Sequence, residues 1–155
     1  SNNQKLMILV LDNVIDPRNL GACIRSAAVT EVDALIINKH HCAPLNEVAH
    51  SVSAGGAENV KTFFVSNLVN CIKYLKEMNI QIFGLSEHAQ IEYIECDFVQ
   101  HSAVIMGSEE FGIRKKTEEN CDYLIKLNNN KNFKSFNVSV ATGIILSEIA
   151  RQRTC

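Results

Sequence analysis

Short apolar runs alternate along this chain with segments whose apolar side chains recur every three or four residues. This alternation constrains the fold more than any other feature of the sequence. An unbroken apolar run is typical of a strand buried on both faces, and the longer period is typical of a helix that covers such a sheet. We expect strands at 7–11, 34–37, 60–65, 81–85, 103–106 and 123–127, and helices at 20–29, 44–51, 68–78, 117–120 and 138–151. The order predicts an α/β fold with a mainly parallel sheet flanked by helices.

The size and composition agree with one globular domain. The chain has 155 residues, of which 46% are hydrophobic and 21% are charged. We therefore expect residues 1–155 to form a single domain. No apolar run approaches the roughly 20 residues that a membrane-spanning helix needs. Residues 1–5 also lack the apolar core of a secretory signal, so we expect a cytoplasmic protein without membrane association.

The charges are unevenly distributed. The net charge of −2 does not by itself indicate a nucleic-acid-binding protein. Residues 113–155, however, carry eight Lys and Arg against four Asp and Glu, whereas the rest of the chain carries seven against thirteen. A local basic face can attract phosphates, and a solvated surface that happens to be basic explains the same counts equally well.

Motifs for metal, dinucleotide and nucleoside triphosphate binding are missing. None of the six cysteines forms a C-x-x-C pair, so we expect reduced, mostly structural thiols. His40 and His41 lack spaced partners, so no metal is expected. No G-x-G-x-x-G follows the first predicted strand and no G-x-x-x-x-G-K-[ST] occurs, which argues against the usual enzymes of those two nucleotide classes.

Three segments combine glycine or small polar residues with potential active-site groups: 19–25, 106–112 and 135–141. Each segment has a purely structural interpretation, namely a helix cap followed by a surface arginine, an ordinary strand-to-helix loop, and a second helix cap. A cap needs only one small polar side chain. The group of Ser135, Asn137 and Ser139 therefore also indicates a binding site at a helix N-terminus, and ligands in parallel sheets bind beyond the carboxyl ends of the strands.

Taken in order, the stretches 11–27, 104–112 and 135–143 resemble the three sequence motifs of the SpoU (TrmH-like) RNA ribose 2′-O-methyltransferases, a branch of the SPOUT superfamily. The resemblance runs nearly from end to end of the chain. It implies a SPOUT fold whose C-terminal part forms a deep trefoil knot, an exception to the usual unknotted topology. It also implies S-adenosylmethionine as the cofactor, RNA as the substrate and a homodimer.

The family motifs imply a set of site residues. The polar active-site positions are Asn19, Arg25, Glu109, Ser135 and Asn137. The cofactor is expected to contact Gly107, Leu127 and Phe136, mostly through backbone groups, with Leu85 lining the same pocket. RNA is expected to contact Arg25, Arg114 and Lys115, although a solvated helix end explains the basic cluster at 114–116 nearly as well.

The chain departs from the family pattern at the expected cofactor pocket. It has Leu127-Asn128-Asn129 where the family usually has Ile-Pro-Met, and Phe136 where the family usually has Leu. The small N-terminal RNA-binding domain of related ribosomal enzymes has no counterpart in residues 1–155. The first and third motifs are most similar to the branch that methylates a guanosine of bacterial 23S rRNA. A tRNA ribose methyltransferase and a non-catalytic RNA-binding member are the alternatives.

Overall fold

The computed structural model describes residues 4–38, 60–108, 112–127 and 137–154. Its strands are β1 (Met7–Asp12), β2 (Ala34–Asn38), β3 (Thr62–Val65), β4 (Gln81–Leu85), β5 (Ile91–Glu92), β6 (Ser102–Gly107) and β7 (Tyr123–Lys126). Its helices are α1 (Pro17–Val29), α4 (Leu68–Glu77), the 3₁₀ turn η1 (Tyr93–Glu95), α5 (Lys115–Glu119) and α6 (Val138–Arg153). The helix expected at 44–51 lies outside the described residues.

The strands form one seven-stranded sheet in the order β3-β2-β1-β6-β4-β7-β5. All six neighbouring pairs are parallel. The predicted α/β class with a mainly parallel sheet is therefore confirmed. The trefoil knot stays a prediction, because residues 128–136 lie outside the described part.

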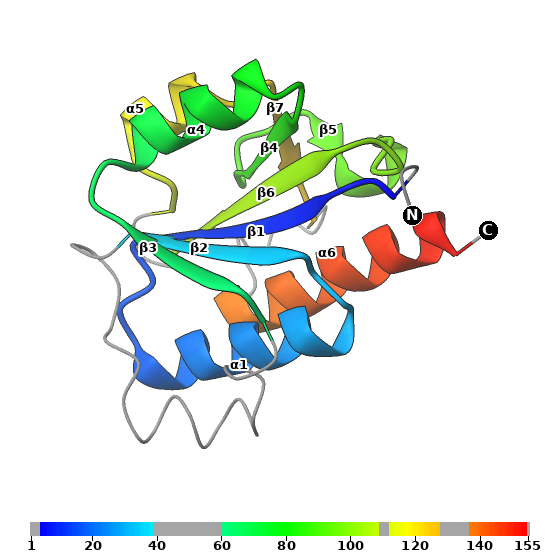
Figure 1. Cartoon of the computed structure of the whole chain (residues 1–155), viewed down its shortest axis with the longest axis horizontal. Helices are drawn as coiled ribbons and strands as arrows, with labels where there is room; N and C mark the ends of the chain where they lie inside the picture. The colour runs from blue at the N-terminus through cyan, green and yellow to red at the C-terminus, as the bar shows by residue number, and fades with distance from the viewer. Residues whose placement is uncertain (1–3, 39–59, 109–111, 128–136, 155) are drawn as a thin grey trace.

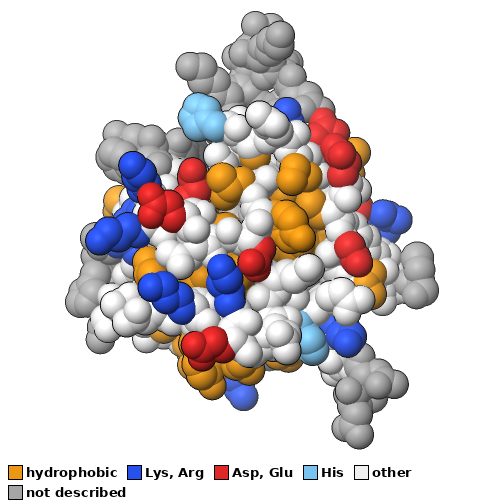
Figure 2. Space-filling view, turned by 90° about the horizontal axis from the view of Figure 1, so that it is seen from above, with side chains coloured by type: hydrophobic (Ala, Val, Ile, Leu, Met, Phe, Trp, Pro, Cys, Tyr) orange, Lys and Arg blue, Asp and Glu red, His pale blue; other side chains and the backbone are white. Residues whose placement is uncertain are grey.

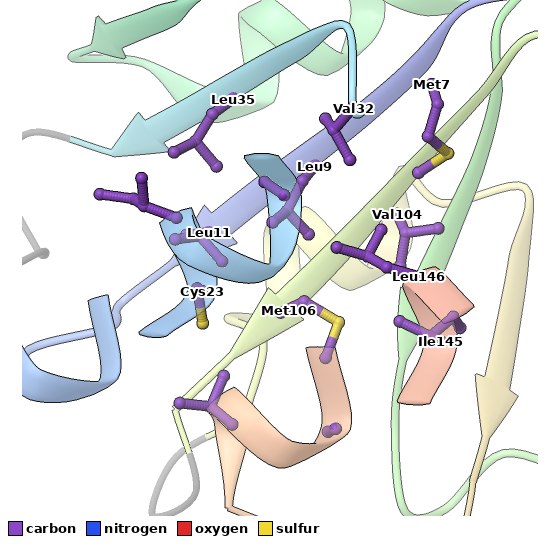
Figure 3. Close-up of a cluster of buried hydrophobic side chains, with 14 of the residues drawn as sticks. Met7, Leu9, Leu11, Cys23, Val32, Leu35, Val104, Met106, Ile145 and Leu146 are labelled. Atoms are coloured by element: carbon purple, nitrogen blue, oxygen red, sulfur yellow. The ribbon is translucent and has the colours of Figure 1, made fainter. Parts of the chain in front are cut away.

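Helices cover both faces of the sheet (Figure 1), with α1 and α6 on one face and α4 and α5 on the other. Side chains of β1 alternate between two cores: Leu9 and Leu11 point toward α1 and α6, and Ile8 and Val10 point toward α4. Figure 3 shows the first core, where Leu9, Leu11, Val104 and Met106 meet Cys23 of α1 and Ile145 of α6. Because both faces are buried, the central strands are continuously apolar.

The chain direction determines where polar groups can gather. Each of the parallel strands β1, β6, β4 and β7 ends at the same edge of the sheet, and α1 and α6 begin near that edge. Both chain termini lie at the opposite edge, where the strands begin (Figure 1). We call the edge where the strands end the carboxyl edge, because the carboxyl ends of the strands meet there.

The opposite edge is held by side chains that bind backbone groups. The carboxylate of Asp33 accepts a hydrogen bond from Met7 N at 2.7 Å, and that of Asp122 accepts one from Ile82 N at 2.8 Å, so each extends a strand ladder by one bond. The guanidinium of Arg153 donates to four carbonyl oxygens, those of Lys5, Leu6, Phe98 and Gln100, at 2.7–3.1 Å. Arg153 thereby fastens the end of α6 to the start of β1 and to the segment before β6.

The structure differs from the sequence-based elements in a few places. Helix α1 begins at Pro17, three residues before the predicted start, because Asp16 is the cap and accepts a hydrogen bond from Arg18 N at 2.9 Å. Strand β3 begins two residues later than expected, and β5 and η1 were not predicted. None of the described Cys23, Cys71, Cys96 and Cys121 forms a disulfide. None of the helices in the described ranges is long and apolar enough to cross a membrane.

Candidate active site

At the carboxyl edge, the place between the ends of β1 and β6 is one where ligands commonly bind in parallel sheets. From β1 the chain continues to β2 on one side, whereas from β6 it continues to β7 on the other side. Such a change of direction between neighbouring strands separates the loops that follow them and leaves room for a ligand. Asp12 and Gly107 are the last residues of β1 and β6, and they lie opposite each other in the ladder.

Gly107 lies where the backbone folds back most tightly on itself. A Cβ atom at Gly107 would collide with the backbone of Gly112 and Ile113. The return of the loop is closed by a hydrogen bond of 2.7 Å from Gly112 N to Ser108 O, and Gly112 has a positive φ of 64°. Because glycine has no Cβ atom, the backbone of residues 107 and 108 can lie close to that of residues 112 and 113.

Asp12 and Arg114 form an ion pair beside this loop, in which Asp12 is buried and Arg114 is partly exposed. Asp12 is fully buried, and its Oδ1 accepts a hydrogen bond from Arg114 Nε at 3.0 Å. Its Oδ2 accepts a second bond from the backbone N of Arg114 at 3.1 Å. Asp12 was not among the predicted site residues, and Arg114 was expected to contact RNA. The available signal was an acidic side chain at the end of an otherwise apolar buried strand, where an unpaired carboxylate would be costly.

Two leucines form an apolar wall at the same edge. Leu85 ends β4 and Leu127 follows β7, and both are partly buried against the core between the sheet and α6. The strands are adjacent, with Leu85 paired to Ile125, and Ser86 N donates to Ile125 O at 2.9 Å. The two predicted cofactor-pocket leucines therefore come from neighbouring strand ends, on the side of β6 away from β1.

Asn19 and Arg25 both lie on α1, which starts at the carboxyl edge. Asn19 is in the first turn and partly buried, whereas Arg25 is exposed. Six residues of helix separate the two by roughly 9 Å along the axis and about 120° around it. They share one helix but lie on different faces of it.

Helix α6 brings the third motif to the same edge. Asn137 is its N-cap, and its Oδ1 accepts hydrogen bonds from the backbone N and the hydroxyl of Ser139. Just inside the helix, Thr142 Oγ1 lies 3.4 Å from Cys23 Sγ of α1 and donates to Val138 O at 2.7 Å. The contact between Cys23 and Thr142 packs the first turns of α1 and α6 side by side, which brings the first and third motifs together.

The remaining predicted site residues are placed only in part. Glu109, Ser135 and Phe136 lie outside the described residues. Lys115 is exposed at the start of α5. Figure 2 shows the face formed by α4 and α5, where basic side chains are interspersed with acidic ones rather than gathered into one basic patch. Within the described ranges, no three His, Cys, Asp or Glu side chains come together as metal ligands.

Comparison with known proteins identifies a family that covers nearly the whole chain. The sequence pattern of the SpoU rRNA Methylase family matches residues 6–147. The 23S rRNA (guanosine-2′-O-)-methyltransferase RlmB of Escherichia coli is 43% identical over 147 residues, which are 95% of this chain and 60% of that protein. RlmB of Xanthomonas campestris is 38% identical over 149 residues, again 60% of that protein. The chain thus spans about three fifths of the length of these curated relatives.

Solved structures share the fold. The SpoU methyltransferase AviRb from Streptomyces viridochromogenes superposes with a TM-score of 0.90 over 97% of this chain and 61% of AviRb, at 23% identity. AviRb in complex with the cofactor AdoMet gives a TM-score of 0.89. The A. aeolicus TrmH/SpoU tRNA modifying enzyme gives 0.86 at 30% identity, over 97% of this chain and 77% of that protein.

Proposed function

Because this chain belongs to the SpoU rRNA Methylase family, we propose that it transfers the methyl group of S-adenosylmethionine to a ribose 2′-hydroxyl of RNA. The observation that carries the proposal is the convergence of Asp12, Gly107, Leu85, Leu127 and Asn137 at one edge of the sheet. Residues far apart in the sequence, from all three motif regions, meet there around a crevice position of a parallel sheet.

The described residues suit a nucleoside cofactor. Leu85 and Leu127 offer an apolar wall for a purine, and the tightly folded backbone at Gly107 offers amide and carbonyl groups for its polar edge. We propose that these three residues and Phe136 hold S-adenosylmethionine, which supplies an electrophilic methyl group on a sulfonium centre. The Leu127-Asn128-Asn129 and Phe136 departures alter side chains of this pocket, whereas its contacts rely mostly on backbone groups.

The reaction is an in-line displacement. The ribose 2′-oxygen bonds to the methyl carbon while the carbon–sulfur bond breaks, the electron pair stays on sulfur, and the hydroxyl proton passes to water or a phosphate oxygen. The chain has to align the two reactants and stabilise the negative charge that develops on the ribose oxygen. We assign that stabilisation to Arg25, because a guanidinium keeps its proton at any ordinary pH and cannot act as the base.

The other polar positions orient the reactants in this scheme. Asn137 already engages Ser139 as the α6 cap, so its amide nitrogen rather than its oxygen is available to the ribose or the cofactor. Asn19 lies six residues before Arg25, in the first turn of α1 at the carboxyl edge. Glu109 and Ser135 are assigned by their positions in the second and third motifs.

We propose a guanosine of 23S rRNA as the substrate, because the RlmB relatives are 38–44% identical over 94–96% of the chain. The 30% identity to a TrmH/SpoU tRNA modifying enzyme keeps tRNA as the second candidate. The exposed Lys115 and the part of the Arg114 guanidinium not engaged by Asp12 would contact phosphates. Such a protein works in the cytoplasm, where its RNA is.

We propose a homodimer that forms through the outer face of α6. A hollow of about 620 Å³ lies there between Tyr93 and α6, lined by Ser139, Val140, Gly143, Ile144 and Ser147 and, at one end, by Glu148 and Arg151. Small residues four apart leave room for a second helix, and Val140 is half exposed without an apolar cover among the described residues. Val140→Glu is expected to give monomers in sedimentation velocity with an unchanged circular dichroism spectrum. Dimers of unchanged affinity would contradict this interface.

The catalytic assignment is tested with a matched pair of arginine variants. Arg25→Ala is expected to lose methyl transfer to RNA while it still binds S-adenosylhomocysteine. Arg18→Ala removes another exposed arginine from the same helix and is expected to keep wild-type transfer. Near wild-type transfer by Arg25→Ala would refute the assignment. Cofactor binding without transfer by the wild-type chain would identify a non-catalytic RNA-binding member.

A further inference from the structure

Asp12 is a buried carboxylate that the proposed mechanism does not use. It is completely inaccessible to solvent at the end of β1, whose other residues are apolar. A carboxylate there is costly unless it is paired and hydrogen-bonded. Its position is specific, because its neighbour in the adjacent strand is Gly107, the residue assigned to the cofactor.

Both oxygens of Asp12 are bound by the same residue. Arg114 Nε donates to Oδ1 at 3.0 Å, and the backbone N of Arg114 donates to Oδ2 at 3.1 Å. One bond therefore fixes the Arg114 side chain and the other fixes the main chain where it enters α5. The two residues are 102 positions apart, so the pair ties the end of β1 to the segment that returns from the Gly107 loop.

The loop is thereby anchored at both of its ends. At its start, Gly107 is the last ladder residue of β6. At its end, Gly112 N binds Ser108 O, and the next residues, Ile113 and Arg114, are buried and bound to Asp12, respectively. Because a Cβ atom at Gly107 would meet the backbone of 112 and 113, any shift of that returning backbone is transmitted to Gly107.

We propose that Asp12 and Arg114 are positioning residues for the cofactor: they hold the returning backbone against Gly107 and so set the geometry of the Gly107 backbone groups. The pair acts through Gly107 and touches neither reactant. This inference rests on the proposed function in that the ligand at Gly107 is the S-adenosyl group. It also gives Arg114 an intramolecular task beside the proposed RNA contact, because only part of its guanidinium is engaged by Asp12.

The alternative is that the Asp12–Arg114 pair stabilises the fold without affecting the cofactor. Asp122 offers a control that distinguishes the two explanations. Asp122 has the same two kinds of partner, because its Oδ2 accepts a bond from Ile82 N at 2.8 Å and its Oδ1 lies 3.7 Å from Lys76 Nζ. It precedes β7, so it lies at the opposite edge of the sheet. Asp122→Asn therefore removes a carboxylate with similar partners, although a less buried one, without disturbing the carboxyl edge.

The experiment measures binding of S-adenosylhomocysteine by isothermal titration calorimetry, without RNA, for the wild type and four variants. Asp12→Asn leaves one acceptor oxygen for two N–H donors, and Arg114→Met removes the cation. Both are expected to weaken binding about tenfold, since each loses a charge-assisted hydrogen bond. Arg114→Lys keeps the cation and the backbone bond, and is expected to recover part of the loss. Asp122→Asn is expected to change binding by less than about twofold, even where it lowers the melting temperature.

Steady-state methylation separates positioning from chemistry. The KM for S-adenosylmethionine is expected to rise in Asp12→Asn, with kcat at saturating cofactor close to wild type. Unchanged S-adenosylhomocysteine affinity in Asp12→Asn or Arg114→Met would overturn the proposal, as would an equal loss in Asp122→Asn. If Asp12→Asn does not fold, the two Arg114 variants give the same test. A wild type that binds S-adenosylhomocysteine but methylates no RNA would sink the proposed function and leave this inference standing.

Discussion

The tight fold at Gly107 gives a quantitative prediction for Gly107→Ala. The backbone dihedral φ of Gly107 is not positive, so alanine is not strained by conformation there. The added methyl group would instead meet the main chain of Gly112 and Ile113. Main-chain atoms that are held by the Ser108 and Asp12 hydrogen bonds cannot rotate away as a flexible side chain would.

The expected cost follows from this geometry. Forcing one extra carbon into a packed site costs about 1–3 kcal/mol, because the neighbours have to shift. For a domain of this size each kcal/mol lowers the melting temperature by about 2–4 °C, so we expect a decrease of roughly 2–12 °C. The same shift of the 112–113 backbone is expected to weaken S-adenosylhomocysteine binding, because Gly107 borders the proposed cofactor pocket.

Gly143→Ala is the control for this experiment, and both variants are made in the Val140→Glu background so that the proposed α6 interface does not contribute. A Cβ atom at Gly143 would have Ser26 Oγ at 3.7 Å, an ordinary contact, as its nearest neighbour outside α6. Both substitutions restrict the unfolded chain equally, so their difference in urea unfolding isolates the steric effect. Gly143→Ala is expected to be neutral or to stabilise by up to about 1 kcal/mol, as alanine does inside a helix. If Gly107→Ala were as stable as Gly143→Ala, the reasoning about the loop would be refuted.

Three further predictions concern the rest of the fold. Arg153→Met is expected to lower the free energy of unfolding by about 2–4 kcal/mol in urea titrations, because four carbonyl oxygens lose their charged donor; a loss below about 0.5 kcal/mol would contradict the clamp. Hydrogen bonds from Arg151 and Gln152 lower the pKa of Glu148 from 4.5 to about 2. Its contribution to stability is therefore present above pH 4.5 and lost as the pH falls toward 2, so wild type and Glu148→Gln should differ in urea midpoint at pH 6 and converge at pH 2. A pH-independent difference would be inconsistent with that lowered pKa. Burial, followed by the nearby Glu118 and Asp122 carboxylates, raises the pKa of Cys121 from 9.0 to about 12. Iodoacetamide at pH 8 should therefore label Cys121 much more slowly in the native protein than in urea, as measured by peptide mass spectrometry, and equal rates would refute the assignment.

The sequence predicted the central strands because they are buried on both faces. Successive side chains of β1, β4 and β6 alternate between the two cores. No polar residue therefore interrupts the apolar run, and the run can be recognised in the sequence of the strand itself. Strand β5 was missed because two residues, Ile91 and Glu92, carry no periodicity. The start of α1 was placed three residues late because the cap was expected within segment 19–25, whereas Asp16 is the cap.

The site was predictable as far as its residues belong to local motifs. Gly107, Leu85, Leu127, Asn19 and Asn137 lie at the carboxyl edge that the strand pattern indicated. Their spatial relations were not predictable, since a sequence does not state that β1 lies beside β6 rather than β4.

The same limit explains why the Asp12–Arg114 pair was not predicted. The two residues are 102 positions apart in the sequence, so only the fold shows that they are in contact.

The most direct test of the central claim is transfer of labelled methyl groups from S-adenosylmethionine to RNA from cells that lack the gene, followed by nuclease digestion to locate the label. The account predicts label on the 2′-oxygen of a guanosine in 23S rRNA, and none with Arg25→Ala. Label in tRNA alone would keep the chemistry and replace the substrate. No label in either RNA, from a protein that binds S-adenosylhomocysteine, would contradict the claim that this chain is a methyltransferase.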